Sequence, residues 1–180
     1  MMVRTALILG VCLIALPVLA EAPPAPYAGQ QARTIKSLSA EDIVALQRGE
    51  GMGMAKAAEL NGYPGPRHVL DLDAQLRLSP DQRQQIQAII DRMSAAARPL
   101  GVELIERERH LDQLFQKGDV SADRVSAATA SIAELQGRLR SVHLSAHLET
   151  RALLTPDQKA LYQKLRGYGE PGAPMHHHHG

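Results

Sequence analysis

The sequence predicts an all-α protein built on one long antiparallel helical hairpin with short flanking helices. One observation is a repeated phrase, LSPDQ at Leu78–Gln82 and LTPDQ at Leu154–Gln158, each copy having the features of a helix start. A second is the helical spacing of apolar residues between the two copies. A third is the scarcity of aromatic residues. With four Tyr, one Phe and no Trp, the core must come from aliphatic side chains, as is typical of packed long helices.

The first 20 residues are expected to be a secretory signal peptide, which implies a periplasmic protein. Arg4 precedes an uncharged run from Thr5 to Ala20 that ends in a sequence resembling a cleavage site. The alternative is a retained membrane anchor, although the run of about 16 residues is shorter than a membrane-spanning helix needs. Cys12 lies within the run and would be removed with it. The mature chain would then have no thiol for a disulfide, a nucleophile or a metal site.

Residues 21–37 are rich in Pro, Ala, Gly and Gln and are predicted to form a disordered lead-in to a helical domain over residues 38–168. This domain should begin with a short helix capped by Ser39 and ending near Arg48. A second short helix should follow a glycine-rich break and end near Leu60, before the break NGYPGP at 61–66. Residues 68–76 either form another short helix or lie irregularly against the hairpin.

In each repeated phrase every position has a role at a helix start. The hydroxyl of Ser79 or Thr155 accepts from free backbone amides of the first turn, and the following Pro occupies a position that needs no amide donor. The Asp favours the positive end of the helix dipole. Gln82 or Gln158 can complete a reciprocal capping box. The phrases therefore predict two helix starts, one on each side of the hairpin.

The hairpin itself is predicted from two apolar stripes. Apolar residues recur three, four or seven positions apart from Ile86 to Leu114 and again from Val125 to Leu153, with Gly118 between the two series. Helices with such stripes pack at shallow angles, so the two should be antiparallel. The first would be about 58 Å long at 1.5 Å per residue. That is too long for a compact monomer core, so part of the hairpin should meet another surface, and a homodimer is expected.

Charge and motif content exclude several functions. The formal net charge is +1, and removal of Arg4 would leave a neutral chain, which argues against nucleic acid or an anionic membrane as the main partner. The sequence has no glycine-rich phosphate loop and no recognisable Ser-His-Asp context. We therefore do not expect an enzyme.

His143 and His147 are the first candidate metal ligands. They are four residues apart, so both rings can lie on one helix face, on the flank of the apolar stripe. If the hairpin turns near Asp119, Met93 and Asp91 would lie opposite them. Imidazole, thioether and carboxylate together suit Cu, Ni, Co or Zn. The alternative is a pair of ordinary histidines that cover the seam, a common arrangement in helices.

Four further residues are candidates for a partner surface. Leu144 and Leu148 point away from the hairpin seam, and they are either covered by a short helix or exposed to a second subunit or a client protein. Met52 and Met54 lie in a Gly-Met-Gly-Met sequence. They can offer soft sulfur to Cu(I), adapt to varied partners, or dock the first short helix into a groove.

The C-terminal residues 169–180 are expected to be a flexible tail. Its consecutive imidazoles would bind divalent metals weakly and in several registers. The tail is either native or an expression tag. Its candidate ligands are His176, His177, His178 and His179.

The repeated phrase resembles the LTxxQ signature of the Spy/CpxP-like periplasmic family, which includes heavy-metal sensor and resistance proteins. The matching positions are Leu78, Ser79 and Gln82, and Leu154, Thr155 and Gln158. Ser79 departs from the signature but keeps the hydroxyl cap. The resemblance covers about residues 39–168. It implies a small helical cradle, usually dimeric, in proteins that either hold unfolded envelope proteins without ATP or restrain or report to a membrane-bound stress or metal sensor.

Two functional hypotheses follow. The first is an ATP-independent holding chaperone for unfolded clients, acting in envelope stress or metal homeostasis through a mixed apolar and charged surface. The second is a metal-binding or sensing module that uses the His and Met ligands. No cofactor is required for the first hypothesis.

Overall fold

The computed structural model describes residues 25–168. The predicted signal peptide and the histidine-rich tail lie outside these residues. The described chain divides into a short N-terminal unit, residues 25–31, and a helical unit, residues 32–168. A 3₁₀ helix, η1, covers Gln30–Ala32. None of the described helices is both long enough and apolar enough to cross a membrane.

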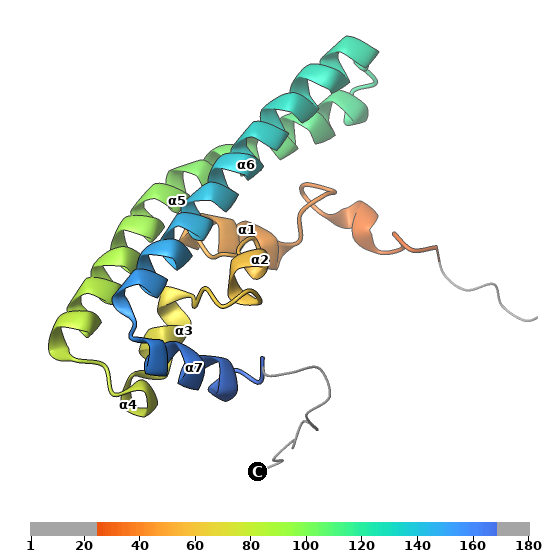
Figure 1. Cartoon of the computed structure of the whole chain (residues 1–180). Helices are drawn as coiled ribbons and strands as arrows, with labels where there is room; N and C mark the ends of the chain where they lie inside the picture. The colour runs from red at the N-terminus through yellow and green to blue at the C-terminus, as the bar shows by residue number, and fades with distance from the viewer. Residues whose placement is uncertain (1–24, 169–180) are drawn as a thin grey trace, which may run out of the picture. The chain divides into compact units, whose positions relative to one another are not determined.

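The helical unit is all-α, as predicted, and consists of a long hairpin with short helices packed along it (Figure 1). The hairpin is formed by α5, Pro80–Gln116, and α6, Ala122–Leu153. The short helices are α1, Ala40–Arg48; α2, Lys56–Glu59; α3, Pro66–Asp71; α4, Asp73–Leu76; and α7, Pro156–Leu165. Helices α1 and α3 pack on α5, α2 and α3 contact α6, and α4 contacts α7.

The helix starts follow the caps that the sequence predicts. Ser39, Ser79 and Thr155 each accept a hydrogen bond from the backbone N–H three residues on, and each heads a reciprocal capping box. Ser121 caps α6 in the same way without the reciprocal bond. Residues 68–76, for which the sequence left two alternatives, are mostly helical, in α3 and α4.

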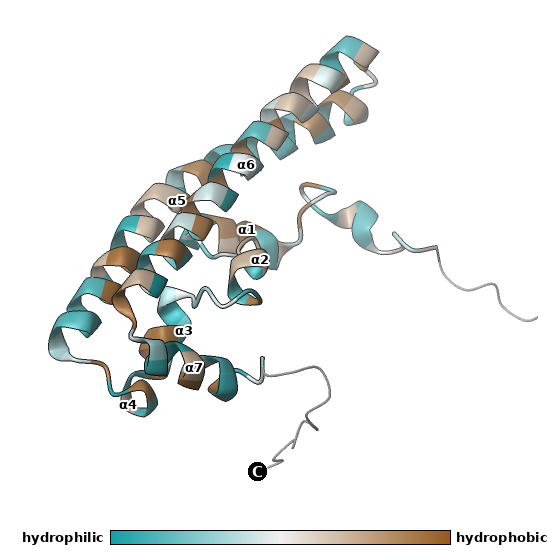
Figure 2. Ribbon diagram, in the orientation of Figure 1, coloured by the Kyte–Doolittle hydropathy of each residue, from teal (hydrophilic) through white to brown (hydrophobic). Residues whose placement is uncertain are grey.

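The predicted apolar stripes form the core. Ile86, Ile89, Leu104 and Leu139 are all less than 5 % exposed. Figure 2 shows hydrophobic and hydrophilic residues alternating along α5 and α6, as expected of helices with one buried face. Side chains from the short helices complete this core, because the hairpin seam alone covers only one face of each long helix.

The lead-in prediction needs correction at its C-terminal end. Ile35 is fully buried, in one cluster with Leu46 and Leu104, and a bridge between Ile35 and Leu38 closes a tight turn. Ser37 donates a hydrogen bond to Glu108 at 2.8 Å. Packing against the hairpin therefore begins before residue 38, because one large aliphatic side chain in a polar segment is enough to anchor it to a hydrophobic surface.

Candidate functional site

The two LTxxQ phrases meet at the open end of the hairpin, where their glutamines pair. The side-chain amide of Gln82 donates to Gln158 Oε1 at 2.8 Å, and that of Gln158 donates to Gln82 Oε1 at 3.1 Å. Each Oε1 also accepts from the backbone N–H of its own cap residue, at 3.0 Å from Ser79 and 3.0 Å from Thr155. The side-chain amide of Gln82 also donates to the backbone carbonyl of Leu153, and that of Gln158 donates to the backbone carbonyl of Leu76.

This glutamine pair explains why the phrase occurs twice. Each glutamine caps its own helix and also completes the hydrogen bonding of the other, so the two helix starts are fixed relative to one another. Leu78 and Leu154 are 6 % and 4 % exposed and pack in one cluster with Tyr162. The motif residues are thus structural and hold α5, α6 and α7 together.

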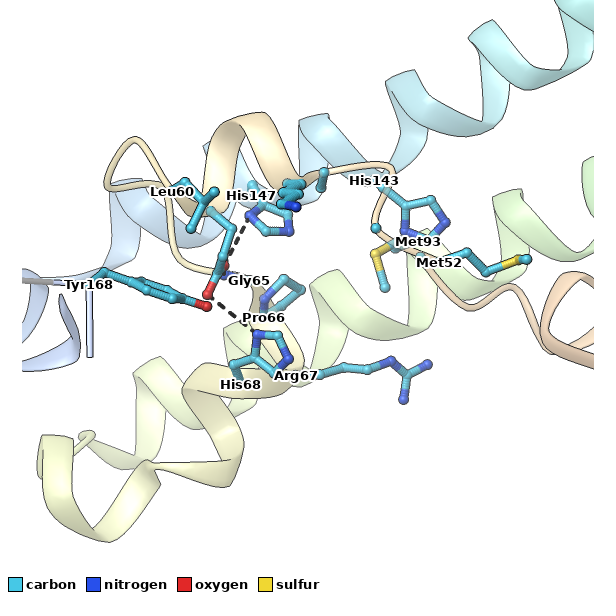
Figure 3. A pocket seen from close by; sticks show the side chains of 15 residues that line it. Met52, Leu60, Gly65, Pro66, Arg67, His68, Met93, His143, His147 and Tyr168 are labelled. Carbon is cyan, nitrogen blue, oxygen red and sulfur yellow. Dashed lines mark hydrogen bonds and ion pairs between the residues drawn. The ribbon is translucent and has the colours of Figure 1, made fainter. Parts of the chain in front are cut away.

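A cavity of about 390 Å³ lies between α6 and the short helices (Figure 3). The segment from Gly51 to Arg67 passes over α6 there, and glycine permits its close approach. A Cβ on Gly65 would lie 3.0 Å from His147 Cε1, and one on Gly51 would lie 3.4 Å from His143 Nδ1. The polar and sulfur-bearing side chains that line the cavity are Met52, Lys56, Glu59, Arg67, His68, Met93, His143 and His147.

Glu59 is the buried anchor of the cavity wall, with an exposed fraction of 7 %. Its Oε1 accepts from the Tyr162 hydroxyl at 2.5 Å and lies 3.6 Å from Arg166 Nε. Its Oε2 accepts from the Gly65 backbone N–H at 2.9 Å and lies 3.6 Å from His147 Nδ1. Burial and the bond to Glu59 raise the pKa of Tyr162. A buried carboxylate is stable only with such partners, so Glu59 ties the short helices to α7.

His143 differs from His147 in its hydrogen bonding. His147 Nδ1 donates to the Tyr63 carbonyl at 2.7 Å. His143 is 3 % exposed, and its Nε2 has no hydrogen-bond partner within the described residues. Burial, with smaller effects of His147 and Arg67, lowers the pKa of His143 below its ordinary value. Burial therefore favours the neutral ring beside the cavity, and its buried Nε2 is left without a hydrogen-bond partner among the described residues.

The structure brings together three of the predicted metal ligands but not the carboxylate. His143, His147 and Met93 all line the cavity. Asp91 was expected beside them and is not there, since it is exposed and accepts from Gln87 on the same helix. The sequence predicted both histidines on the flank of the apolar stripe, and both are buried because the short helices cover that side of α6. No group of three His, Cys, Asp or Glu able to hold a metal occurs in residues 25–168.

The predicted partner-surface residues separate into two kinds. Leu148 is 57 % exposed on α6, and Met52, which lines the cavity, is 43 % exposed. Leu144 is half-buried on α6, and Met54 is half-buried and packs against the core, as the docking alternative expected. His176, His177, His178 and His179 lie outside the described residues.

Sequence reasoning missed Glu59, Arg67 and His68. His68 Nδ1 lies 3.5 Å from Glu59 Oε1, so the site includes a third histidine that had no assigned role. These residues lie in short helices whose position on α6 depends on tertiary packing. One available signal was the position of Glu59, at the end of a four-residue helix just before the break at 61–66.

A second concave surface, the hairpin groove, is lined only by residues of α5 and α6. Its volume is about 680 Å³. Aliphatic side chains form its floor, including Ile89, Leu100 and Val142, and the charged residues Arg92, Glu103, Arg138 and Glu149 surround them. Arg92 and Glu149 form an ion pair at 2.6 Å across the groove.

The comparisons with known proteins identify the class to which this fold and its paired motif belong. The family model of the LTXXQ motif family matches residues 66–166, from α3 to the end of α7. The chain therefore belongs to the LTXXQ motif family, the Spy/CpxP-like family of non-enzymatic, chaperone-like or sensor-like proteins. No curated protein matches the chain significantly, and no solved structure does.

Proposed function

We propose that this LTXXQ protein is a periplasmic holding chaperone that binds unfolded envelope proteins without ATP and uses the hairpin groove to do so. The observation that carries the proposal is the composition of the groove, in which aliphatic side chains alternate with charges of both signs. Unfolded chains expose apolar segments and charged side chains together, and such a surface can contact both. Membership of the LTXXQ family supports this class of function.

The groove also has the accessibility that weak, repeated client binding needs. Its lining residues include Ala96 and Ser145, both exposed, so no side chain of the described residues fills it. Further apolar side chains on the hairpin lie open to solvent, Val102 at 48 % and Phe115 at 59 %. Both lie on α5 outside the groove, and individually such exposed residues are ordinary.

The experiment is an aggregation assay with a denatured client enzyme and two matched variants. Ala96→Glu places a charge in the groove without changing the core, and Ala95→Glu makes the same change at an exposed neighbouring position outside it. We expect the unaltered protein and A95E to suppress light scattering at equimolar amounts, and A96E to lose most of this effect. No suppression by the unaltered protein, or equal suppression by A96E and A95E, would remove the proposal.

The alternative is a heavy-metal sensor or binding protein, and one observation favours a soft metal. The neutral His143 ring lies beside the thioethers of Met93 and Met52 in the cavity, and imidazole with thioethers suits Cu(I). Calorimetric titration of a chain ending at Gly172 with Cu(I), Zn²⁺, Ni²⁺ and Co²⁺ separates this cavity from the histidine tail. Binding no tighter than about 1 mM by every metal would exclude the internal site.

Localisation and assembly stay predictions. Export would require removal of residues 1–20, which N-terminal sequencing of protein from the periplasm tests directly. A homodimer is expected from the length of the hairpin, and light scattering of the purified protein measures it. A membrane-bound stress or metal sensor as partner is expected only in the sensor alternative.

A further inference from the structure

We propose that the cavity beneath the Gly51–Arg67 segment binds a small amphipathic carboxylate, with the carboxylate facing Arg67, Lys56 and His143 and the apolar body lying over Met52 and Met93. The proposal is independent of the holding function, which uses the hairpin groove. A volume of about 390 Å³ lies within the range of pockets for small organic molecules.

The charges around the cavity favour an anion. Lys56 and Arg67 both line it, and neither forms an ion pair with any described residue. The one acidic residue in the lining, Glu59, is buried and engaged by Tyr162, Gly65 and Arg166. Arg67 donates a hydrogen bond to Ser94 at 3.2 Å, but neither cation has an anionic partner among the described residues, so both can attract an anion to the cavity.

His143 provides the second, independent observation. Its buried Nε2 has no partner within the described residues, and a buried polar atom without a partner costs free energy. The other charged or titratable groups around the cavity are His147 from α6, Arg67 and His68 from α3, Lys56 and Glu59 from α2, and Tyr168 after α7. A carboxylate bound in the cavity would favour protonation of the His143 ring, which burial and, to a smaller extent, His147 and Arg67 now oppose.

The rest of the lining selects an organic anion over an inorganic one. Met52, Met93, Leu60, Pro66 and the Tyr168 ring give the cavity an apolar wall (Figure 3). A hydrated phosphate or chloride would leave this wall uncovered, whereas an alkyl or aryl body would bury it. A bare cation would face Arg67 and Lys56, so a divalent metal is the less favourable occupant.

The test is a titration of the full mature chain with octanoate, followed by calorimetry and by NMR of the histidine rings. Octanol is the control with the same apolar body and no charge, and acetate is the control with the charge and almost no body. We expect octanoate to bind with a Kd below about 1 mM, to shift the His143 ring signals, and to bind at least about tenfold more tightly than either control. Equal binding of octanol, or no binding of octanoate, would overturn the proposal.

Charge variants locate the site. Lys56→Gln combined with Arg67→Gln should weaken octanoate binding at least about tenfold. Lys164→Gln combined with Arg107→Gln removes the same charges from exposed positions outside the cavity and should leave the Kd unchanged. Circular dichroism checks that each variant is folded. Unchanged affinity for octanoate in the first variant would show that the carboxylate assignment is wrong. The same conclusion would follow if Cu(I) displaced octanoate and bound equally well to the unaltered protein and to the first variant.

Discussion

The base and the tip of the hairpin are built from the same two helices but are held in different ways. The base comprises residues 80–105 of α5 and 132–153 of α6, and the tip comprises residues 113–131. In the base, the short helices cover one side, Glu59 and Thr150 are buried polar groups with partners, and the half-buried glutamine pair is bonded on both sides. In the tip, Leu114 is the one buried side chain among the described residues, and Phe115 and Val120 are exposed.

The comparison indicates that buried contacts fix the hairpin at its base and not at its tip. Polar contacts at the tip are between exposed groups, such as the ion pair of Asp119 with Arg124, and contribute little to stability. The base is specified by buried groups whose partners come from several helices, and each of these is costly to break. The tip is therefore expected to have lower local stability than the base and to open first. Four predictions test this contrast, in order of decreasing effect.

Removal of the buried carboxylate at the base should have the largest effect. Glu59→Ala leaves the Tyr162 hydroxyl, the Gly65 N–H and Arg166 without their acceptor, and we expect a loss of about 4 kcal/mol in the free energy of unfolding. Asp119→Ala removes a carboxylate at the tip and should cost less than about 1 kcal/mol. Urea unfolding followed by circular dichroism measures both. Similar losses in the two variants would contradict the contrast between base and tip.

Two glycine substitutions compare the covered and uncovered faces of the hairpin. A Cβ on Gly101 would lie 2.2 Å from the backbone oxygen of Leu46 in α1, so Gly101→Ala should displace α1 and cost about 3 kcal/mol. A Cβ on Gly137 would meet nothing within 4 Å, so Gly137→Ala should stabilise α6 by about 0.5–1 kcal/mol. Thermal unfolding of the two variants checks these opposite signs. A stable G101A protein would mean that α1 is not held closely to α5.

Gln82 and Gln158 should contribute to the free energy of unfolding as one coupled pair. Gln82→Ala removes a capping bond and leaves the Gln158 amide partly unsatisfied, with an expected loss of about 2 kcal/mol. The double variant Q82A/Q158A should lose clearly less than the sum of the single losses, because each single change already breaks the pair. Gln116→Ala, which removes an exposed bond to Asp112 near the tip, should cost below about 0.5 kcal/mol. Additive losses at 82 and 158 would show that the two amides act separately.

Mild acid should lower the stability of the hairpin base through protonation of His143. Its folded-state pKa is lowered by burial and by His147 and Arg67, so the unfolded chain binds more protons in the window just below the ordinary His pKa of about 6.5. Stability is therefore fully present above that pH and is lost as the pH falls through it. The thermal midpoint should decrease between pH 7.5 and 5.5. This decrease should be smaller in His143→Gln and unchanged in His110→Gln, an exposed substitution on α5. Equal decreases in all three proteins would exclude His143 as the group responsible.

Several features were predictable from the sequence because they depend on residues close together in the chain. The caps at Ser39, Ser79 and Thr155 lie where they were expected, and the residues of the α5 stripe are buried. The approach of Met93 to His143 was also predictable, because an antiparallel hairpin with a known turn fixes which residues lie opposite one another.

The polar surroundings of the cavity were not predictable in this way. Glu59 and Arg67 reach His143 and His147 only because α2 and α3 fold back over α6. Asp91 has a suitable charge and spacing but lies on the solvent side of α5. Neither outcome follows from helical periodicity, since periodicity says which face is buried and not which segment covers it.

The sequence by itself determined the fold class, the helix starts, the hairpin and the membership of the LTXXQ family, because capping and apolar spacing are local properties of the chain. Three features came from tertiary packing: the bonds between the two motif glutamines, the place of Ile35 in the core, and the cavity beneath the short helices, with a buried histidine and two cations that form no ion pair among the described residues. Those features depend on which distant segments meet, and that is set by the combined burial of side chains from several helices.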